Sequence, residues 1–273
     1  MEYILSLAGG LSALAQPYPG ILAFDFGRYL VAAGLVSWVL VLTSKRYRER
    51  RWVRKRQPAE NQRRREVAYS ASAAAVFATV GLGVYHGAVL GLFHIYDAVA
   101  DYGWAYWAFS LVLIVVAHDA YFYWTHRLMH RNSMFPWTHR AHHLSVAPTQ
   151  WATYAFAPGE ALIQAMFLPI FLLFLPVHDS VIFVWMAHQV LRNALGHSGI
   201  EMMPKQWLAT WWGRWLTTTL HHDLHHAHGK GNYGLYFTWW DRWCTTERED
   251  YRPKLAALIA NIDQETRNSY AER

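Results

Sequence analysis

The sequence predicts an all-α, polytopic membrane protein with about four membrane helices and a histidine-rich helical cap on the cytoplasmic side. Hydrophobic residues make up 53% of the 273-residue chain and charged residues only 16%, a balance more apolar than that of soluble domains. Eight of the sixteen histidines fall in three short boxes beyond the apolar stretches. No repeat or composition break divides the chain, so residues 1–273 are expected to form a single domain.

The first membrane helix is predicted over residues 20–43. At ~1.5 Å per residue this stretch is long enough to cross a bilayer core about 30 Å thick. Asp25 and Arg28 stand three residues apart near its start, which favours an ion pair on one helical face close to the lipid head groups. Residues 1–20 are expected to form an uncleaved apolar segment at the membrane interface.

A basic run separates the first helix from the second. Residues 45–65 contain eleven Lys or Arg, which is typical of a cytoplasmic loop under the positive-inside rule. The net charge of +6 is concentrated there without any nucleic-acid-binding motif, which argues against a nucleic-acid partner. The second helix is predicted over 68–96. The connection at 97–103 has no Lys or Arg, as expected on the opposite side.

The third helix is predicted to run over 104–130 and to leave the bilayer on the side of the basic run. Its first residues are an aromatic cluster suited to the interface. Two shorter apolar stretches follow, 161–175 with Pro169 inside it and 180–196, and each is short for a full span. They predict a helical hairpin that reaches only part of the way across the bilayer. The remainder, 197–273, is expected to form the cap.

The histidine boxes have the spacing of metal ligands. His126 and His130 are four residues apart at the end of the third helix, so both imidazoles point to one side. Arg127 follows the first histidine where a zinc protease would have its glutamate base, which excludes that chemistry. Two further boxes share the pattern H-x-x-H-H, and they consist of His139, His142 and His143, and of His222, His225 and His226.

Adjacent histidines within a box indicate two metals rather than one. Neighbouring residues on a helix face directions about 100° apart, so His142 and His143 cannot easily share an ion. His197, at the end of the last apolar stretch, adds a ninth donor. Nine imidazoles suit two ions with positions left for oxygen species. Iron is the first candidate, although this ligand type also allows zinc, copper and manganese. The single cysteine excludes a multi-cysteine site.

Two polar residues near the boxes are candidates for catalytic roles. Asp119 lies within about 20° of the face that carries the first box on a helical wheel. It is expected to face the site from deeper in the membrane, where it would orient a ligand, relay protons or meet a polar substrate group. A structural partnership with His118 or Arg192 is the alternative. Asn193 precedes His197 by four residues and is expected beside the metals.

These motifs resemble the fatty acid hydroxylase/sterol desaturase superfamily of membrane-bound di-iron enzymes. The resemblance spans about residues 105–245 and is carried by HDAYFYWTHRLMH, HRAHH, NALGHSG and HHDLHHAHGKGNYG followed by WWDRW. It implies a four-helix membrane base, a cytosolic cap, two iron ions, O2 as co-substrate and an external electron donor. By motif position it assigns the eight box histidines to the metals, and His197 matches a further histidine of the family. Asn193 stands where the fatty acid 2-hydroxylase branch has a histidine, which points to the sterol desaturase branch.

The resulting hypothesis is an O2-dependent oxidoreductase that hydroxylates or desaturates a C–H bond of a membrane lipid, either a sterol, a fatty acyl lipid or a related one. The lipid is expected to enter between 104–130 and 160–197. Electrons would come from a separate protein of the cytochrome b5, ferredoxin or reductase type. The chain would be a multi-pass protein of the bacterial inner membrane, with its metal site on the cytoplasmic side.

Two other functions remain open from the residues alone. A metal-dependent lipid hydrolase would use a similar cluster of histidines, and an oxygen requirement discriminates it from the oxidoreductase. A non-enzymatic metal-binding membrane protein is the other alternative, and the number and identity of the bound metal ions distinguish it.

Overall fold

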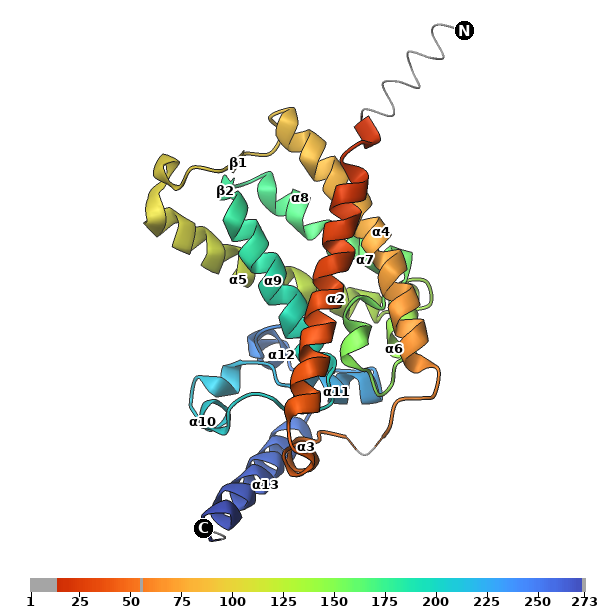
Figure 1. Ribbon diagram of the computed structural model, residues 1–273, viewed down its shortest axis with the longest axis vertical. Coiled ribbons are helices and arrows are strands. Elements are labelled where there is room, and N and C mark those ends of the chain that lie inside the picture. The colour runs from red at the N-terminus through yellow and green to blue at the C-terminus, as the bar shows by residue number, and fades with distance from the viewer. Residues whose placement is uncertain (1–13, 55, 272–273) are drawn as a thin grey trace, which may run out of the picture.

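The computed structural model of the chain describes residues 14–54 and 56–271, and most of the regular structure is helical (Figure 1). The expectation for residues 1–20 lies largely outside the described residues. Three helices are long and apolar enough to cross a membrane, and they are α2 (Tyr18–Leu42), α4 (Gln62–Val89) and α5 (Gly103–Met129). The predicted helices at 20–43 and 104–130 are therefore confirmed.

The predicted second helix is displaced toward the N-terminus. It begins at Gln62 inside the basic run and ends at Val89, not at residue 96. The reversal after it uses Gly91, whose φ of +76° lies in the left-handed region that glycine adopts without strain. Beyond this turn, β1 (Ile95–Tyr96) pairs in parallel with β2 (Val177–His178), which joins the loops at one end of the membrane helices.

The two shorter apolar stretches form the predicted hairpin. Its first arm is broken into α7 (Pro158–Ala165) and α8 (Phe167–Leu172), and its second arm is α9 (Asp179–His197). Pro169 explains the break, because proline has no amide hydrogen and its ring crowds the carbonyl four residues earlier, at the point where α7 ends.

The long helices pack around a shared interior and keep an apolar exterior. α2 packs against α4 and α9, and α5 packs against α9; Figure 1 shows α2 and α4 running beside each other along the molecule. Outward-facing side chains on these helices remain apolar, with Val31 69%, Val41 77% and Trp104 72% exposed. Continuous exposed apolar surface of this kind is suited to contact with lipid.

The C-terminal part of the chain forms a helical cap at one end of the long helices (Figure 1). It has its own core, in which Leu220, Leu224, Tyr251 and Leu255 pack together. Its elements are α10 (Lys205–Leu208), η3 (Gly213–Trp215), α11 (Thr219–His228), α12 (Trp239–Trp243) and α13 (Tyr251–Ala271). Two 3₁₀ turns, η1 (Val99–Asp101) and η2 (Gln150–Tyr154), lie in the connections before it.

Part of the basic run holds this cap in place. The run folds into α3 (Lys45–Arg51) and continues into the segment that carries Arg54. Arg51 donates from Nη1 to the backbone carbonyl of Glu201 at 3.0 Å. Arg54 forms a buried ion pair with Asp223 on α11 at 2.9 Å. These two arginines therefore tie the first membrane helices to the cap and do not face lipid head groups.

Candidate metal centre

The first histidine box lies at the end of α5. His126 is on the last turn and is buried, while His130 ends the helix and donates its backbone N–H to the carbonyl of His126 at 3.2 Å. Because the two residues are one turn apart, both imidazoles leave the same side of the helix, and their ring centroids are 5.1 Å apart. The membrane helix thus ends as one wall of the site.

The second box is brought back onto the first by a compact turn. After α5 the chain reverses and forms α6 (Arg140–His143), a single helical turn that begins directly after His139. Phe135 in the reversal packs against His130 and His143, with ring centroids 5.4 and 5.8 Å apart. This aromatic contact supports both boxes from one side.

The third box occupies α11, whose start is stabilised by two side chains. Thr218 Oγ1 accepts the backbone N–H of His221 at 3.0 Å, and Glu201 Oε2 accepts the backbone N–H of Thr219 at 2.8 Å. A carboxylate at this position also complements the positive end of the helix dipole. Gly229, with a φ of +66°, ends the helix just beyond the box.

The nine predicted histidines gather in two groups, and within each group the ligand nitrogens lie within 4.8 Å of one another. Adjacent histidines are divided between the groups in both H-x-x-H-H boxes, as their helical geometry predicts. The first group consists of His126, His130, His139, His143 and His225. The second group consists of His142, His197, His222 and His226.

Two outward ring nitrogens of the first group are engaged in a way that directs Nε2 into that group. Nδ1 of His126 lies 2.9 Å from the carbonyl of Tyr233, and Nδ1 of His225 lies 2.8 Å from the carbonyl of Gly231. A carbonyl can only accept, so each Nδ1 carries the proton and each Nε2 presents a lone pair. This arrangement is the one that orients histidine ligands around a metal.

The imidazoles of the second and third boxes are held in the neutral form. Burial lowers the pKa of all six of these histidines well below the usual value, and neighbouring imidazoles lower it further because their positive charges would repel. Neutral imidazole is the form that binds metals. These side chains are therefore ready to act as ligands at neutral pH.

The geometry and chemistry of both groups fit a bound cation. A metal–nitrogen bond of ~2.1 Å places opposed ligands about 4.2 Å apart across one ion, which is compatible with the 4.8 Å limit on each group. The inward nitrogens approach one another closely, as between Nε2 of His130 and Nε2 of His225 at 3.1 Å and between Nε2 of His197 and Nε2 of His222 at 2.9 Å. A cation bound at either position would accept lone pairs from several of these nitrogens at once. Imidazole-only donor sets suit iron, zinc and copper.

Asp119, predicted to face the metals, holds part of the cap instead. One carboxylate oxygen accepts the backbone N–H groups of Tyr236 at 2.8 Å and Phe237 at 3.2 Å, and the other accepts the indole N–H of Trp239 at 2.7 Å. Its hydrogen-bond partners are thus neither His118 nor Arg192. His118 contacts the same segment, with Nδ1 2.9 Å from the hydroxyl of Tyr236. The structure therefore shows Asp119 as an anchor for residues 236–239.

Asn193 lies beside the centre but outside both histidine groups. Its side-chain amide donates to the carbonyl of Thr153 at 2.8 Å. Its backbone carbonyl accepts Nδ1–H of His197 at 2.8 Å, which orients that imidazole. The side chain also lines a small pocket that reaches His222. Asn193 thus supports His197 through the backbone and lies beside the second group.

Glu160 is a functional residue that the sequence analysis missed. Its Oε1 lies 2.7 Å from Nδ1 of His139, and both side chains are almost completely buried. A buried carboxylate on the outer nitrogen of a histidine fixes the ring and makes it a stronger ligand. The available signal was a single acidic residue directly before the apolar stretch 161–175. Spacing along the chain does not connect it with His139, which lies 21 residues earlier.

A largely apolar cavity of about 320 Å³ lies one layer of side chains away from both histidine groups. Its volume is at the lower end of the range of small-molecule sites. Two of its lining residues contact the histidines directly: Phe122 packs on His126 with ring centroids 5.0 Å apart, and Phe156 packs on His142 at 5.3 Å. These two phenyl rings therefore separate a molecule in this cavity from the histidine groups.

The exposed residues of the cavity wall are on α2, α4 and α9. They are Phe24, Tyr85 and Phe183, which are 42%, 48% and 53% exposed, and Phe24 meets Phe183 edge to face at 5.5 Å. The sequence analysis expected the lipid to enter between 104–130 and 160–197. The α5 residues that line the cavity are buried, so the exposed part of the wall is not on that helix. The cavity opens toward the lipid between the first two membrane helices and the hairpin.

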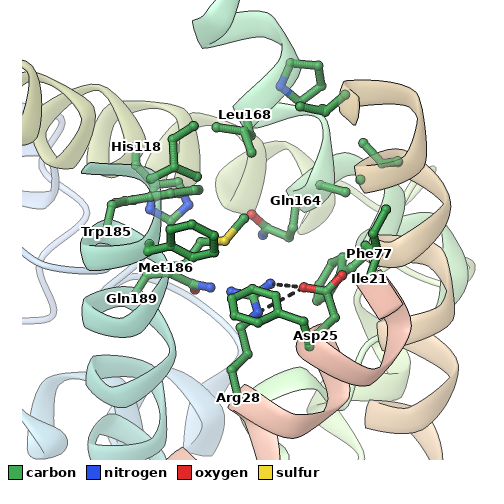
Figure 2. A pocket seen from close by; sticks show the side chains of 18 of the residues that line it. Ile21, Asp25, Arg28, Phe77, His118, Gln164, Leu168, Trp185, Met186 and Gln189 are labelled. Carbon is green, nitrogen blue, oxygen red and sulfur yellow. Dashed lines mark hydrogen bonds and ion pairs between the residues drawn. The ribbon is translucent and has the colours of Figure 1, made fainter. Parts of the chain in front are cut away.

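The ion pair expected near the head groups also faces this cavity. Arg28 and Asp25 lie 2.8 Å apart, which confirms the pairing. Asp25 is only 4% exposed, and both residues line the cavity (Figure 2). The pair faces inward because α2 packs against α4 and α9 on this side.

A family model described as fatty acid hydroxylase matches residues 111–246. The chain belongs to the fatty acid hydroxylase/sterol desaturase superfamily. The matched residues include all three boxes and His197. They also include Phe122 and Phe156, which line the cavity and pack on the histidines.

Curated relatives in the superfamily carry names of sterol enzymes. A delta(7)-sterol 5(6)-desaturase of Gibberella zeae is 31% identical over 65% of this chain and 54% of its own length. One of Aspergillus fumigatus is 29% identical over 65% of this chain and 60% of its own length. Lathosterol oxidase of Rattus norvegicus is 27% identical over 65% of this chain and 58% of its own length. The chain thus spans little more than half the length of these relatives, and no solved structure matches it.

Proposed function

We propose that the protein is an O2-dependent di-iron oxidoreductase that hydroxylates or desaturates a C–H bond of a membrane lipid. The observation that carries this proposal is the convergence of nine imidazoles in two groups beside a largely apolar cavity whose exposed wall residues lie on apolar helices. The names of the relatives favour a sterol or a sterol-like lipid. We further propose that the metal site lies on the cytoplasmic side of a bacterial inner membrane.

The nine histidines would hold one iron ion in each group. Iron bound there would supply the activation of O2 and the removal of hydrogen from the lipid, chemistry that amino-acid side chains do not provide. Either outcome needs O2 and an electron pair from a separate donor protein of the cytochrome b5, ferredoxin or reductase type. Hydroxylation leaves one oxygen atom in the lipid and one in water, whereas desaturation leaves both in water.

The protein's own residues position the lipid and keep the site dry. Phe122 and Phe156 would hold the apolar part of the lipid beside the two histidine groups, and the apolar walls would exclude water. Holding one carbon next to the centre is what selects the product, because reactivity depends on approach at near-contact distance. Asn193 borders the same space and is a candidate for contact with the lipid. Asp119 is proposed to act indirectly, by fixing the segment that closes over the site.

The test is turnover by the purified protein with iron(II), a reducing system, lathosterol and isotopically labelled oxygen. A hydroxylated product carrying the label, or a product that has lost two hydrogens, supports the proposal. His142→Ala and His225→Ala each remove one ligand from a different group and should abolish the product. His94→Ala is the matched control, because His94 is exposed and outside both groups. With a lipid ester as substrate, product formation without O2 would favour a hydrolase, and one zinc ion per chain with no turnover would favour a binding protein.

A further inference from the structure

A buried ion pair lies in the wall of the cavity, where the metal chemistry does not require one. Arg28 donates to Oδ1 of Asp25 from Nε at 3.0 Å and approaches the same oxygen with Nη2 at 2.8 Å. Both contacts use Oδ1, so Oδ2 of Asp25 is not part of the ion pair. Removing two charges from water costs free energy, and their mutual attraction often does not recover all of it. The position of the pair in an otherwise apolar cavity therefore indicates a role in binding.

Two donors in this part of the cavity have no hydrogen-bond partner among the residues that the structure describes. They are Nη1 of Arg28 and Nε2 of Gln164, and both atoms are buried. Buried donors are nearly always paired in folded proteins, so unpaired donors in the wall of a cavity are available to an acceptor on a bound molecule. Figure 2 shows Asp25, Arg28, Gln164 and Gln189 around the same space. These polar groups come from α2, α7 and α9.

We propose that Asp25, Arg28 and Gln164 form a recognition site for the hydroxyl group of an otherwise apolar lipid, such as a sterol. A hydroxyl both donates and accepts, so it can donate to Oδ2 of Asp25 and accept from Arg28 or Gln164. A phosphate or carboxylate head group would instead meet the carboxylate of Asp25, while Arg28 is already neutralised by it. The remaining walls are mainly apolar and suit a hydrocarbon body.

This site would set the position of the lipid along the cavity. One part of the cavity holds the hydroxyl, and another holds the hydrocarbon against Phe122 and Phe156. The distance between them would determine which carbon lies beside the histidines. The claim that the lipid is a substrate rests on the proposed function, but its binding through the hydroxyl does not.

The experiment compares the binding of lathosterol with that of its 3-deoxy analogue to the purified full-length protein in lipid nanodiscs. Both compete with radiolabelled lathosterol under anaerobic conditions, so that no turnover occurs. The wild type is expected to bind the alcohol at least about tenfold more tightly, because a hydrogen-bonding site rejects an analogue that leaves its groups unpaired. Gln164→Leu should reduce this preference by weakening the binding of the alcohol alone.

A second variant replaces the ion pair as a unit. Asp25→Leu combined with Arg28→Leu avoids leaving one buried charge unpaired and should lower the preference to about twofold or less. Gln206→Leu, the same change at an exposed position, is the control and should keep the wild-type preference. If the double variant does not fold, Gln164→Leu decides the outcome.

Equal affinity of the wild type for the alcohol and the deoxy analogue would overturn the inference, as would an unchanged preference in Gln164→Leu. The result is independent of the metal chemistry. A preference for the alcohol that disappears in the variants supports the hydroxyl site even when no oxygen-dependent product forms. Product formation by a protein without this preference would sustain the oxidoreductase proposal and refute the hydroxyl site.

Discussion

The contact between Glu160 and His139 allows a quantitative test of how the first histidine group binds its metal. Oε1 of Glu160 lies 2.7 Å from Nδ1 of His139, and the two side chains are 1% and 2% exposed. Glu160→Gln removes the ionisable carboxyl group and keeps an oxygen that can accept the same N–H. Glu160→Ala removes the acceptor as well and leaves the buried N–H without a partner.

The size of the effect follows from the strength of this hydrogen bond. Hydrogen bonds to charged groups contribute about 1.5–3 kcal/mol, and each ~1.4 kcal/mol changes an equilibrium constant tenfold. Partners on the outer nitrogen of a metal-binding histidine are typically worth about 10–100-fold in affinity. We therefore expect iron(II) binding to weaken about tenfold in Glu160→Gln and about 100-fold in Glu160→Ala.

The assay is anaerobic titration of the purified protein with iron(II) in competition with a chromophoric chelator. Glu66→Gln is the matched control, because Glu66 is also a carboxylate that is 1% exposed. It accepts from Gln62 at 2.7 Å and has no histidine partner among the described residues. Thermal unfolding of each variant separates loss of metal from loss of fold. Wild-type affinity in a folded Glu160→Ala protein would refute the reasoning.

Three further predictions concern how the cap is held. Asp119→Ala leaves three donors without their acceptor and should lower the free energy of unfolding by at least about 3 kcal/mol; loss of turnover in Asp119→Asn at unchanged thermal stability would instead indicate a direct role in the chemistry. Arg54→Ala leaves Asp223 as a buried unpaired charge and should destabilise the protein by about 3–5 kcal/mol. The double variant Arg54→Met with Asp223→Leu should recover part of this stability. Additive losses of stability from the two substitutions would contradict the pairing. Gly199→Ala places a methyl group against the guanidinium of Arg54 at a φ of +75° and should lower the melting temperature measurably, whereas an unchanged value would show that this loop can shift.

The sequence predicts the two histidine groups well because the relevant geometry is local. One helical turn brings His126 and His130 to the same side, and the angle between neighbouring residues divides His142 from His143. Both relations depend on the helix alone. The apolar stretches are predictable for a similar reason, since spanning length and composition are local properties.

The features that the sequence does not predict depend on contacts between distant segments. Glu160 meets His139 only after the chain has passed through η2 and started α7. The helical wheel turns Asp119 toward the box, but its actual partners come from the segment around Tyr236, more than a hundred residues later. The sequence analysis placed the end of α4 too far along the chain. Gly91 reverses the chain inside an apolar stretch whose composition is still suited to a helix.

The third box has a consequence for the dimensions of the centre. His225 and His226 are covalently joined neighbours, yet each belongs to a different group. The separation of the two ions would therefore be fixed partly by the rise and rotation between consecutive residues of α11, which vary little among proteins. Bilayer thickness or lipid composition can tilt the long helices without stretching this dimension. The distance between the two metals would therefore not depend on the thickness or the lipid composition of the membrane.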